Sequence, residues 1–203
     1  MPSLLSQLSP GITNMIRLDH THVLSAFHQY EVGSPARLKK GLADQVCLAI
    51  EIHAQLEEEI FYPALRLVAD GEMLRKAAPE HDEMRAMIAR LRNMPVGDPA
   101  YDDAFFSLMQ HVMHHVADEE TQLLPAAERL IPEQLTELGA RMTRRRLELV
   151  GRRTPELASS MARSLNPGSL VAAASAVLGG AYLLSRHRTG PRSWMRRSGG
   201  LPR

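Results

Sequence analysis

The stretch HAQLEEEIFYP at residues 53–63 recurs 62 positions later as HVADEETQLLP at residues 115–125. Each copy carries a histidine, a glutamate four residues further on and a proline ten residues further on. Because residues four apart lie about 40° from each other around an α-helix, the histidine and the glutamate of each copy point to the same side. The equal offsets predict that the chain contains a duplicated helical hairpin.

The polar pairs of both copies lie on apolar helical faces. In the first copy the pair shares its side with Ile50 and Ile60, and in the second with Val112 and Leu123. One further histidine before each copy also lies on an apolar face, and these two are 61 positions apart. Six polar side chains are therefore expected to converge in the interior, namely His20, His53, Glu57, His81, His115 and Glu119.

A metal ion is the natural partner for such a set. Burying two carboxylates is costly unless a cation offsets their lost hydration. Any one of these residues alone would more often be an ordinary core or surface residue, but the doubled pattern argues against coincidence. Imidazole and carboxylate suit iron, manganese or zinc, and the lack of cysteine ligands disfavours structural zinc or iron–sulfur sites. Two histidines per ion with both glutamates bridging would leave positions open for a small external ligand.

The composition indicates an all-α protein, because aromatic residues make up only 4% of the chain while strong helix formers abound. Helices are expected over about 12–31, 34–68 and 98–124. One more helix is expected between the last two, with its regular part starting at Pro79. Gly33 and Asp70-Gly71 are the expected stops, and Ser34 is an expected N-cap. Short connections predict an antiparallel up-down four-helix bundle, followed by a C-terminal helical tail that is basic and then hydrophobic.

The prolines that end the two copies have a predicted consequence for the helices. A proline inside a helix removes one backbone hydrogen bond and clashes with the preceding turn. Pro63 and Pro125 are therefore expected to kink or end their helices shortly after the glutamates.

The net charge of +1 hides a strong asymmetry. Residues 1–140 hold 11 Lys and Arg against 21 Asp and Glu, whereas residues 141–203 hold 13 Arg against two Glu. The acidic part does not resemble a nucleic-acid surface. We divide the chain into a bundle at 10–130, a basic helical extension at 131–163, and a hydrophobic segment with a basic C-terminal tail at 164–203.

The hydrophobic segment admits several interpretations. Residues 164–185 carry no charge, and a helix over 169–185 would span about 25 Å, slightly less than the bilayer core. The alternatives are a membrane-anchoring or membrane-lying helix, a helix that docks on the acidic bundle or on a partner, and disorder. Contact with nucleic acid is the weakest reading, because only Trp194 interleaves with the arginines. The expected location is the cytoplasm, with attachment to the inner face of a membrane under the first alternative.

The repeated stretches are similar to the signature of the haemerythrin-like, HHE cation-binding family. The resemblance covers about residues 10–130. It implies a four-helix bundle with two iron ions, bridged by carboxylate and by oxo or hydroxo groups, and it implies as ligands the six residues named above. Manganese and zinc are the less expected metals.

Two positions depart from the oxygen-carrying members of that family. Where those proteins place a second histidine one turn after the third-helix ligand, this chain has Arg85, and Glu119 replaces their aspartate. The pattern resembles instead the branch implicated in nitric oxide or peroxide responses and in iron–sulfur repair, although the resemblance does not extend to the cysteine-bearing domain that the repair proteins add, so repair is the less expected role. We therefore expect a protein that binds or senses oxygen, nitric oxide or peroxide. An enzyme that degrades peroxide or nitric oxide and an iron-holding or repair module are the alternatives.

Several other residues near the predicted site invite a functional reading but are expected to be structural. His111 is a candidate spare ligand or partner of a ligand, and Tyr30 and Tyr62 are candidate phenolate ligands with packing as the default. Salt-bridging or solvated roles are expected for Glu58 and Glu120, an inert core position for Cys47, and exposed positions for His22, His28 and His114.

Overall fold

The computed structural model describes residues 10–69 and 74–164, and every regular element within them is helical. The predicted stop at Asp70-Gly71 and the possible helix over 169–185 lie outside the described residues. Within these residues, no helix has both the length and the apolar character needed to cross a bilayer.

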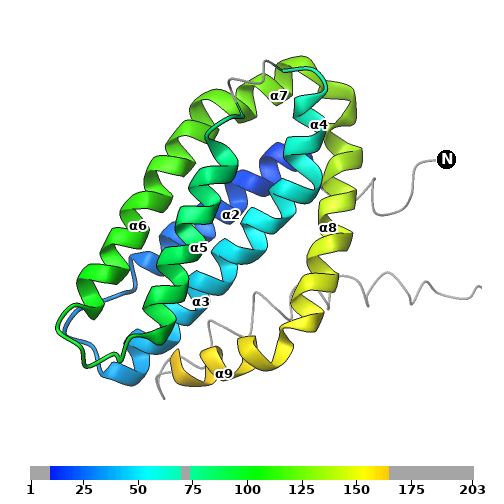
Figure 1. The fold of residues 1–203 in the computed structure, drawn as a ribbon. Coiled ribbons are helices and arrows are strands. Elements are labelled where there is room, and N and C mark those ends of the chain that lie inside the picture. Colours follow the sequence, from blue (N-terminus) through cyan, green and yellow to red (C-terminus); the bar gives the residue numbers. More distant parts are fainter. Residues whose placement is uncertain (1–9, 70–73, 165–203) are drawn as a thin grey trace, which may run out of the picture. The chain divides into compact units, whose positions relative to one another are not determined.

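Four long helical rods form the bundle and confirm the predicted all-α architecture (Figure 1). The first and third rods are single helices, whereas the second and fourth continue through a π-helical turn into a short helix. The elements are α2 (Ile12–Phe27), α3 (Ala36–Leu56), η1 (Glu57–Phe61), α4 (Tyr62–Arg66), α5 (Ala77–Asn93), α6 (Tyr101–Asp118), η2 (Glu119–Leu123) and α7 (Leu124–Leu130).

The helix ends differ from the predicted ones in detail. The first helix ends at Phe27 rather than near Glu31, because hydrogen-bonded turns occupy the residues that follow it. No side-chain hydrogen bond caps α3, and its N-cap position is taken by Pro35, so the predicted capping role of Ser34 is wrong. The third helix begins at Ala77, two residues before the predicted start.

The two prolines neither end nor break their rods, because a π-helical turn precedes each of them. Tyr62 N–H donates to the Glu57 carbonyl, and Leu124 N–H donates to the Glu119 carbonyl, both across five residues. The wider turn accommodates a proline, which has no N–H to donate and would crowd the preceding turn of an α-helix. Each π-helical turn begins at a glutamate of the predicted site, so the repeat in sequence becomes a repeat in backbone geometry.

Two apolar clusters fill the bundle, with the predicted polar residues between them. The first, near α4 and α7, includes Ile16, Phe61 and Leu124. The second includes Val23, Ile50, Met84, Phe105 and Val112, among others. Each histidine of the predicted site falls between members of the two clusters along its helix, so the polar side chains form a layer across the core.

A C-terminal extension packs on the outside of the bundle. It consists of η3 (Pro132–Gln134), α8 (Leu135–Arg152) and α9 (Thr154–Ser164); α8 packs against α2 and α3, and α9 packs against α3 (Figure 1). The division of the chain into a bundle at 10–130 and a separate extension stays a prediction.

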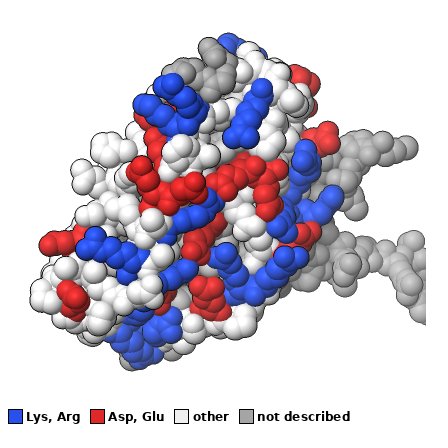
Figure 2. All heavy atoms as spheres, viewed as in Figure 1, with Lys and Arg blue, Asp and Glu red and all other residues white. Residues whose placement is uncertain are grey.

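Ion pairs join the basic extension to the acidic bundle. Four arginines of the extension each pair with an acidic residue of α2, α3 or η1, at 2.5 to 2.8 Å. The pairs are Arg145 with Glu59, Arg146 with Asp19, Arg153 with Glu51, and Arg163 with Asp44. Figure 2 shows the result on one face, where Lys and Arg are interleaved with Asp and Glu. The excess of arginine in the C-terminal part of the sequence and the excess of acidic residues in the N-terminal part therefore meet as ion pairs in the fold.

Gly139 allows the close approach of α8 to the start of α2. A Cβ atom at this position would lie 2.1 Å from the Pro10 carbonyl oxygen and 3.1 Å from the Ile12 nitrogen, both backbone atoms. We expect Gly139→Ala to lower the free energy of unfolding by about 1 to 3 kcal/mol, because one of these segments must move.

The matched control for this prediction is Gly151→Ala in the same helix, where an added Cβ meets nothing within 4 Å. It should be neutral or stabilise by about 0.5 to 1 kcal/mol. Chemical denaturation of both variants measures the difference. Equal stability of the two would contradict the proposed close contact.

Candidate metal centre

The six residues predicted from the sequence come together in the polar layer. All are buried, with Glu57 and His81 at 0% exposure, Glu119 at 1%, and His53 the most exposed at 8%. Each comes from a different turn of the four rods, and the π-helical turns supply the two glutamates. That these residues bind metal remains a prediction at this stage, but their convergence is observed.

The six residues form two overlapping groups of ligand-type atoms. His20, His53, Glu57 and Glu119 make up one group, and Glu57, His81 and His115 make up the other. Within each group the nitrogen and oxygen atoms lie within 4.8 Å of one another. Glu57 belongs to both groups, so one carboxylate lies between two places where a cation could be held.

The carboxylate oxygens differ in the neighbours that they face. Glu57 Oε1 lies 3.3 Å from His53 Nε2, and Glu57 Oε2 lies 3.4 Å from His81 Nε2. Glu119 Oε2 lies 3.3 Å from His20 Nε2 and 3.6 Å from His115 Nε2. The other oxygen of Glu119 accepts a hydrogen bond of 2.8 Å from the Tyr62 hydroxyl. This geometry suits Glu57 as a bridge, while a bridging role for Glu119 remains a prediction.

Unsatisfied atoms in the first group test whether a cation fits. His20 Nε2, His53 Nε2, Glu57 Oε1 and Glu119 Oε2 are buried and have no hydrogen-bond partner among the described residues. Buried polar atoms are nearly always satisfied in folded proteins, and leaving one unsatisfied costs about 1 to 3 kcal/mol. All four belong to the same group, so one cation would satisfy them together.

A carboxylate lies beside the Nδ1 atom of every histidine in the site. The distances are 2.9 Å from His20 to Glu120, 3.4 Å from His53 to Asp19, 2.8 Å from His81 to Glu58 and 2.9 Å from His115 to Glu80. In metal sites such a partner fixes the ring so that Nε2 is presented to the ion. All four rings are therefore oriented for ligation through Nε2.

Two of these carboxylates are themselves held by arginine. Both Asp19 oxygens accept hydrogen bonds from Arg146 of the extension, at 2.6 and 2.5 Å. Glu58 Oε2 accepts one of 2.6 Å from Arg85. Arg85 thus contacts a partner of His81 and lies in neither ligand group.

Asp19 and Glu80 are partners of the predicted ligands that were not foreseen, although their places in the repeat were a signal. Each precedes a predicted ligand in the chain, but each orients the histidine of a different helix, His53 and His115. The predicted salt-bridging roles of Glu58 and Glu120 are seen, with ligand histidines as the partners.

The remaining candidates lie outside the ligand groups. His111 Nε2 lies 3.0 Å from Glu83, and His22, His28 and His114 are exposed as predicted. Tyr30 packs on Phe105 and donates to Asp102. Cys47 is buried, and burial raises the pKa of its thiol to about 12, which agrees with an inert core residue.

Tyr62 was expected to be a packing residue, but it also contacts the predicted ligands. Its ring is buried and its hydroxyl lies within 3.3 Å of Glu119, Glu57 and His81. Burial, followed by the charges of Glu57 and Glu119, raises the pKa of Tyr62, so this hydroxyl remains a donor. Its spacing of five residues from Glu57 follows the π-helical turn, which the sequence analysis did not predict.

Without metal, imidazolium and carboxylate groups neutralise one another. Burial opposes ionisation of Glu57, but the charge of His53 and the nearby imidazoles of His115 and His81 hold its pKa well below the usual value. Burial likewise disfavours protonated His115, yet the nearby carboxylates of Glu57 and Glu119 raise the pKa of His115 to about 10. A cation that binds here therefore replaces protons.

A small void lies in the second apolar cluster beside the ligands. Its volume is about 10 Å³, roughly what one water molecule needs. It is lined by Asp19, His20, Val23, Ile50, His53, Met84, Val112, His115 and Val116. Tyr62 belongs to the other apolar cluster and does not line the void. The site therefore has a hydroxyl donor toward one cluster and apolar space toward the other.

Comparison with known proteins identifies similar chains. Residues 11–127 match the family described as the Hemerythrin HHE cation binding domain. A DNA nickase of a Nostoc species is 25% identical over 130 residues, which are 64% of this chain and 37% of the nickase, so this chain spans little more than a third of that relative. The protein Rv2633c of Mycobacterium tuberculosis, described as uncharacterised, is 28% identical over 112 residues, 54% of this chain and 68% of that protein.

One solved structure supports the fold. It is the crystal structure of a Hemerythrin HHE cation binding domain-containing protein, the Rv2633c homolog from Mycobacterium kansasii. The TM-score is 0.64 at 23% sequence identity, and the match covers 77% of this chain and 99% of that one.

The contact of Arg146 with Asp19 predicts that the extension affects the metal centre. We expect Arg146→Gln to weaken metal binding by roughly tenfold or more, because Asp19 would no longer hold His53 in place. Competition with a chelator measures the affinity. Arg145→Gln is the matched control, since Arg145 pairs with the exposed Glu59, which contacts no ligand. Equal affinities in the two variants would refute this role of Arg146.

Proposed function

The chain belongs to the Hemerythrin HHE cation binding domain family, and on that basis we propose that it is a non-haem di-iron protein that binds or senses a small oxidant. The oxidant is oxygen, nitric oxide or peroxide. Metal binding follows from the family; the number and identity of the ions, and the oxidant, are the proposal. The proposed ligands are His20, His53, Glu57, His81, His115 and Glu119.

The observation that carries this proposal is the pair of buried ligand groups that share Glu57. A structural ion pair would need only one carboxylate and one cation, whereas here four inward-facing imidazoles meet two carboxylates. Each imidazole has its own carboxylate beside Nδ1, the ring nitrogen that faces away from the ligand groups, and this arrangement supports metal-bound histidine. Two groups with one common carboxylate support two ions rather than one.

The family match favours iron, and the donor atoms are compatible with it. Nitrogen and oxygen ligands suit iron, manganese and zinc, and the only cysteine of the chain, Cys47, lies in the second apolar cluster rather than in a ligand group. With four histidines and two carboxylates for two ions, fewer protein donors are present than two six-coordinate ions require. Bound iron would supply open coordination positions and a change of oxidation state.

The protein side chains restrict what can reach those positions. The void beside the ligands is small and walled by Val23, Ile50, Met84, Val112 and Val116 in addition to the ligands, so a bulky organic substrate does not fit. An uncharged diatomic molecule or peroxide is the class of ligand that such a space favours. Toward the first cluster, the Tyr62 hydroxyl donates a hydrogen bond of 2.8 Å to Glu119.

The position of Arg85 supports sensing over simple oxygen carriage. One turn after His81 the side chain is a guanidinium bound to Glu58 and Asp82, so no further imidazole joins the centre there. The second candidate function, turnover of peroxide or nitric oxide, draws on the Tyr62 hydroxyl, a buried hydrogen-bond donor that contacts both Glu57 and Glu119.

Binding and turnover are separated by offering each oxidant to the reduced, iron-loaded protein. We expect a reversible change in the absorption spectrum with at least one of oxygen, nitric oxide and peroxide, without sustained product release. Sustained consumption of the oxidant would favour the enzyme instead. A protein that takes up iron but responds to none of the three would refute the proposed function and leave an iron-holding role.

The shared carboxylate predicts a hierarchy among variants. We expect Glu57→Gln to reduce iron content most, because Glu57 faces both groups, and Glu119→Gln to reduce it less. Elemental analysis of purified protein measures the content. Glu59→Gln is the control, since Glu59 lies two residues away on the exposed side and pairs with Arg145. Wild-type iron content in Glu57→Gln would contradict the assignment of the ligands.

A further inference from the structure

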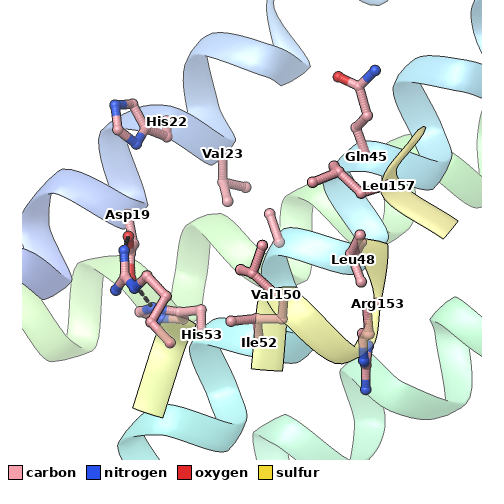
Figure 3. Close-up of a pocket in the computed structure, with 12 residues that line it drawn as sticks. Asp19, His22, Val23, Gln45, Leu48, Ile52, His53, Val150, Arg153 and Leu157 are labelled. Atoms are coloured by element: carbon pink, nitrogen blue, oxygen red, sulfur yellow. Dashed lines mark hydrogen bonds and ion pairs between the residues drawn. The ribbon is translucent and has the colours of Figure 1, made fainter. Parts of the chain in front are cut away.

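A second, larger cavity lies between the bundle and the extension (Figure 3). Its volume is about 210 Å³. Its walls come from α2 and α3 on one side and from α8 and α9 on the other. It is lined by Asp19, His22, Val23, Gln45, Leu48, Ala49, Ile52, His53, Arg146, Val150, Arg153 and Leu157. Nothing in the proposed function uses this cavity, which we call the outer pocket.

The surface of the outer pocket is mainly apolar. Val23 and Leu48 are buried, and Ile52, Val150 and Leu157 are half-buried around it. The charged groups of its wall are already paired, Arg146 with Asp19 and Arg153 with Glu51. An ion would therefore find no unpaired opposite charge among these groups, whereas an uncharged apolar molecule would find apolar contacts.

The outer pocket adjoins the void beside the candidate metal centre. Three residues, Asp19, Val23 and His53, line both spaces. Figure 3 shows Asp19 beside His53 and the side chain of Val23 directed into the pocket. Asp19 is fixed by Arg146 and His53 is a proposed ligand, so Val23 is the one apolar side chain that both spaces share.

We propose that the outer pocket binds a small uncharged apolar molecule, nitric oxide or oxygen, and passes it to the metal centre beside Val23. This inference rests on the proposed function. Apolar gases partition into apolar protein cavities, which raises their concentration beside the barrier that they must cross. The valine side chain is a barrier that rotamer changes can open, because it is held by apolar contacts and not by hydrogen bonds.

The extension is essential to this route. Val150, Leu157, Arg146 and Arg153 all lie beyond residue 127, where the match to the family ends. The outer pocket is therefore a feature of this chain's extension rather than of the four rods alone. The same helix that holds Asp19 through Arg146 also closes the pocket through Val150.

Xenon, an uncharged apolar gas, tests the pocket directly and without regard to iron. Crystals of the full chain under xenon pressure should show xenon among Val23, Leu48, Ile52 and Val150. Ala49→Phe should displace it, because Ala49 is an exposed residue that lines the pocket. Ala89→Phe is the matched control, since Ala89 is also an exposed alanine in a helix, α5, and does not line the pocket.

The association rate of nitric oxide with the reduced, iron-loaded protein tests the passage. We expect Ala49→Phe to slow association by roughly threefold or more and Val23→Ala to accelerate it, whereas Ala89→Phe leaves it unchanged. Iron content should be equal in all four proteins. Because the two pocket variants have opposite expected signs, a general loss of folding cannot mimic the result.

The outcomes separate the two proposals. A wild type that binds nitric oxide but holds no xenon in the pocket, or an unchanged rate in both Ala49→Phe and Val23→Ala, would overturn the outer pocket while leaving the proposed function intact. A wild type that takes up iron and responds to none of the oxidants would overturn the proposed function, and the passage beside Val23 with it.

Discussion

The structure depends on the neutralisation of two carboxylates in the middle of an apolar core. Glu57 and Glu119 have almost no exposed surface, and a buried carboxylate without a cationic partner is strongly destabilising unless it takes up a proton. The chain meets this constraint with four imidazoles, which can neutralise the carboxylates either as imidazolium ions or together with metal. The π-helical turns, the carboxylates behind each histidine and the two apolar clusters all serve to place these six groups.

Periodicity was sufficient to predict the rods and the six inward-facing residues, because a residue's place on a helical face depends only on the sequence around it. The partners of the histidines depend on how neighbouring rods pack, and spacing alone does not contain that information. Asp19 is adjacent to His20 in the chain but contacts His53, and Glu58 crosses to His81. The helix ends after Phe27 and before Ala36 were also missed, since turns and a proline compete there with capping.

Pro63 and Pro125 disturb their helices as predicted, but they do not end them. The loss of a backbone donor at Pro63 and Pro125 was correctly expected to disturb the helix. The disturbance takes the form of a wider turn that keeps the rod continuous, with Glu57 and Glu119 at its start. Tyr62 reaches the ligands because of that turn, so an irregularity of the backbone contributes a side chain to the site.

The duplicated hairpin does not produce two equivalent halves. Asp19 is one methylene shorter than its counterpart Glu80, and it is held by Arg146 of α8, a helix that packs against α2 and α3 of the first half. The two cation positions would then differ in ligand basicity and in rigidity. Loading would be stepwise, and each ion would carry its own spectroscopic signature. The two repeats are similar in sequence, but the two cation positions that they form would not be equivalent.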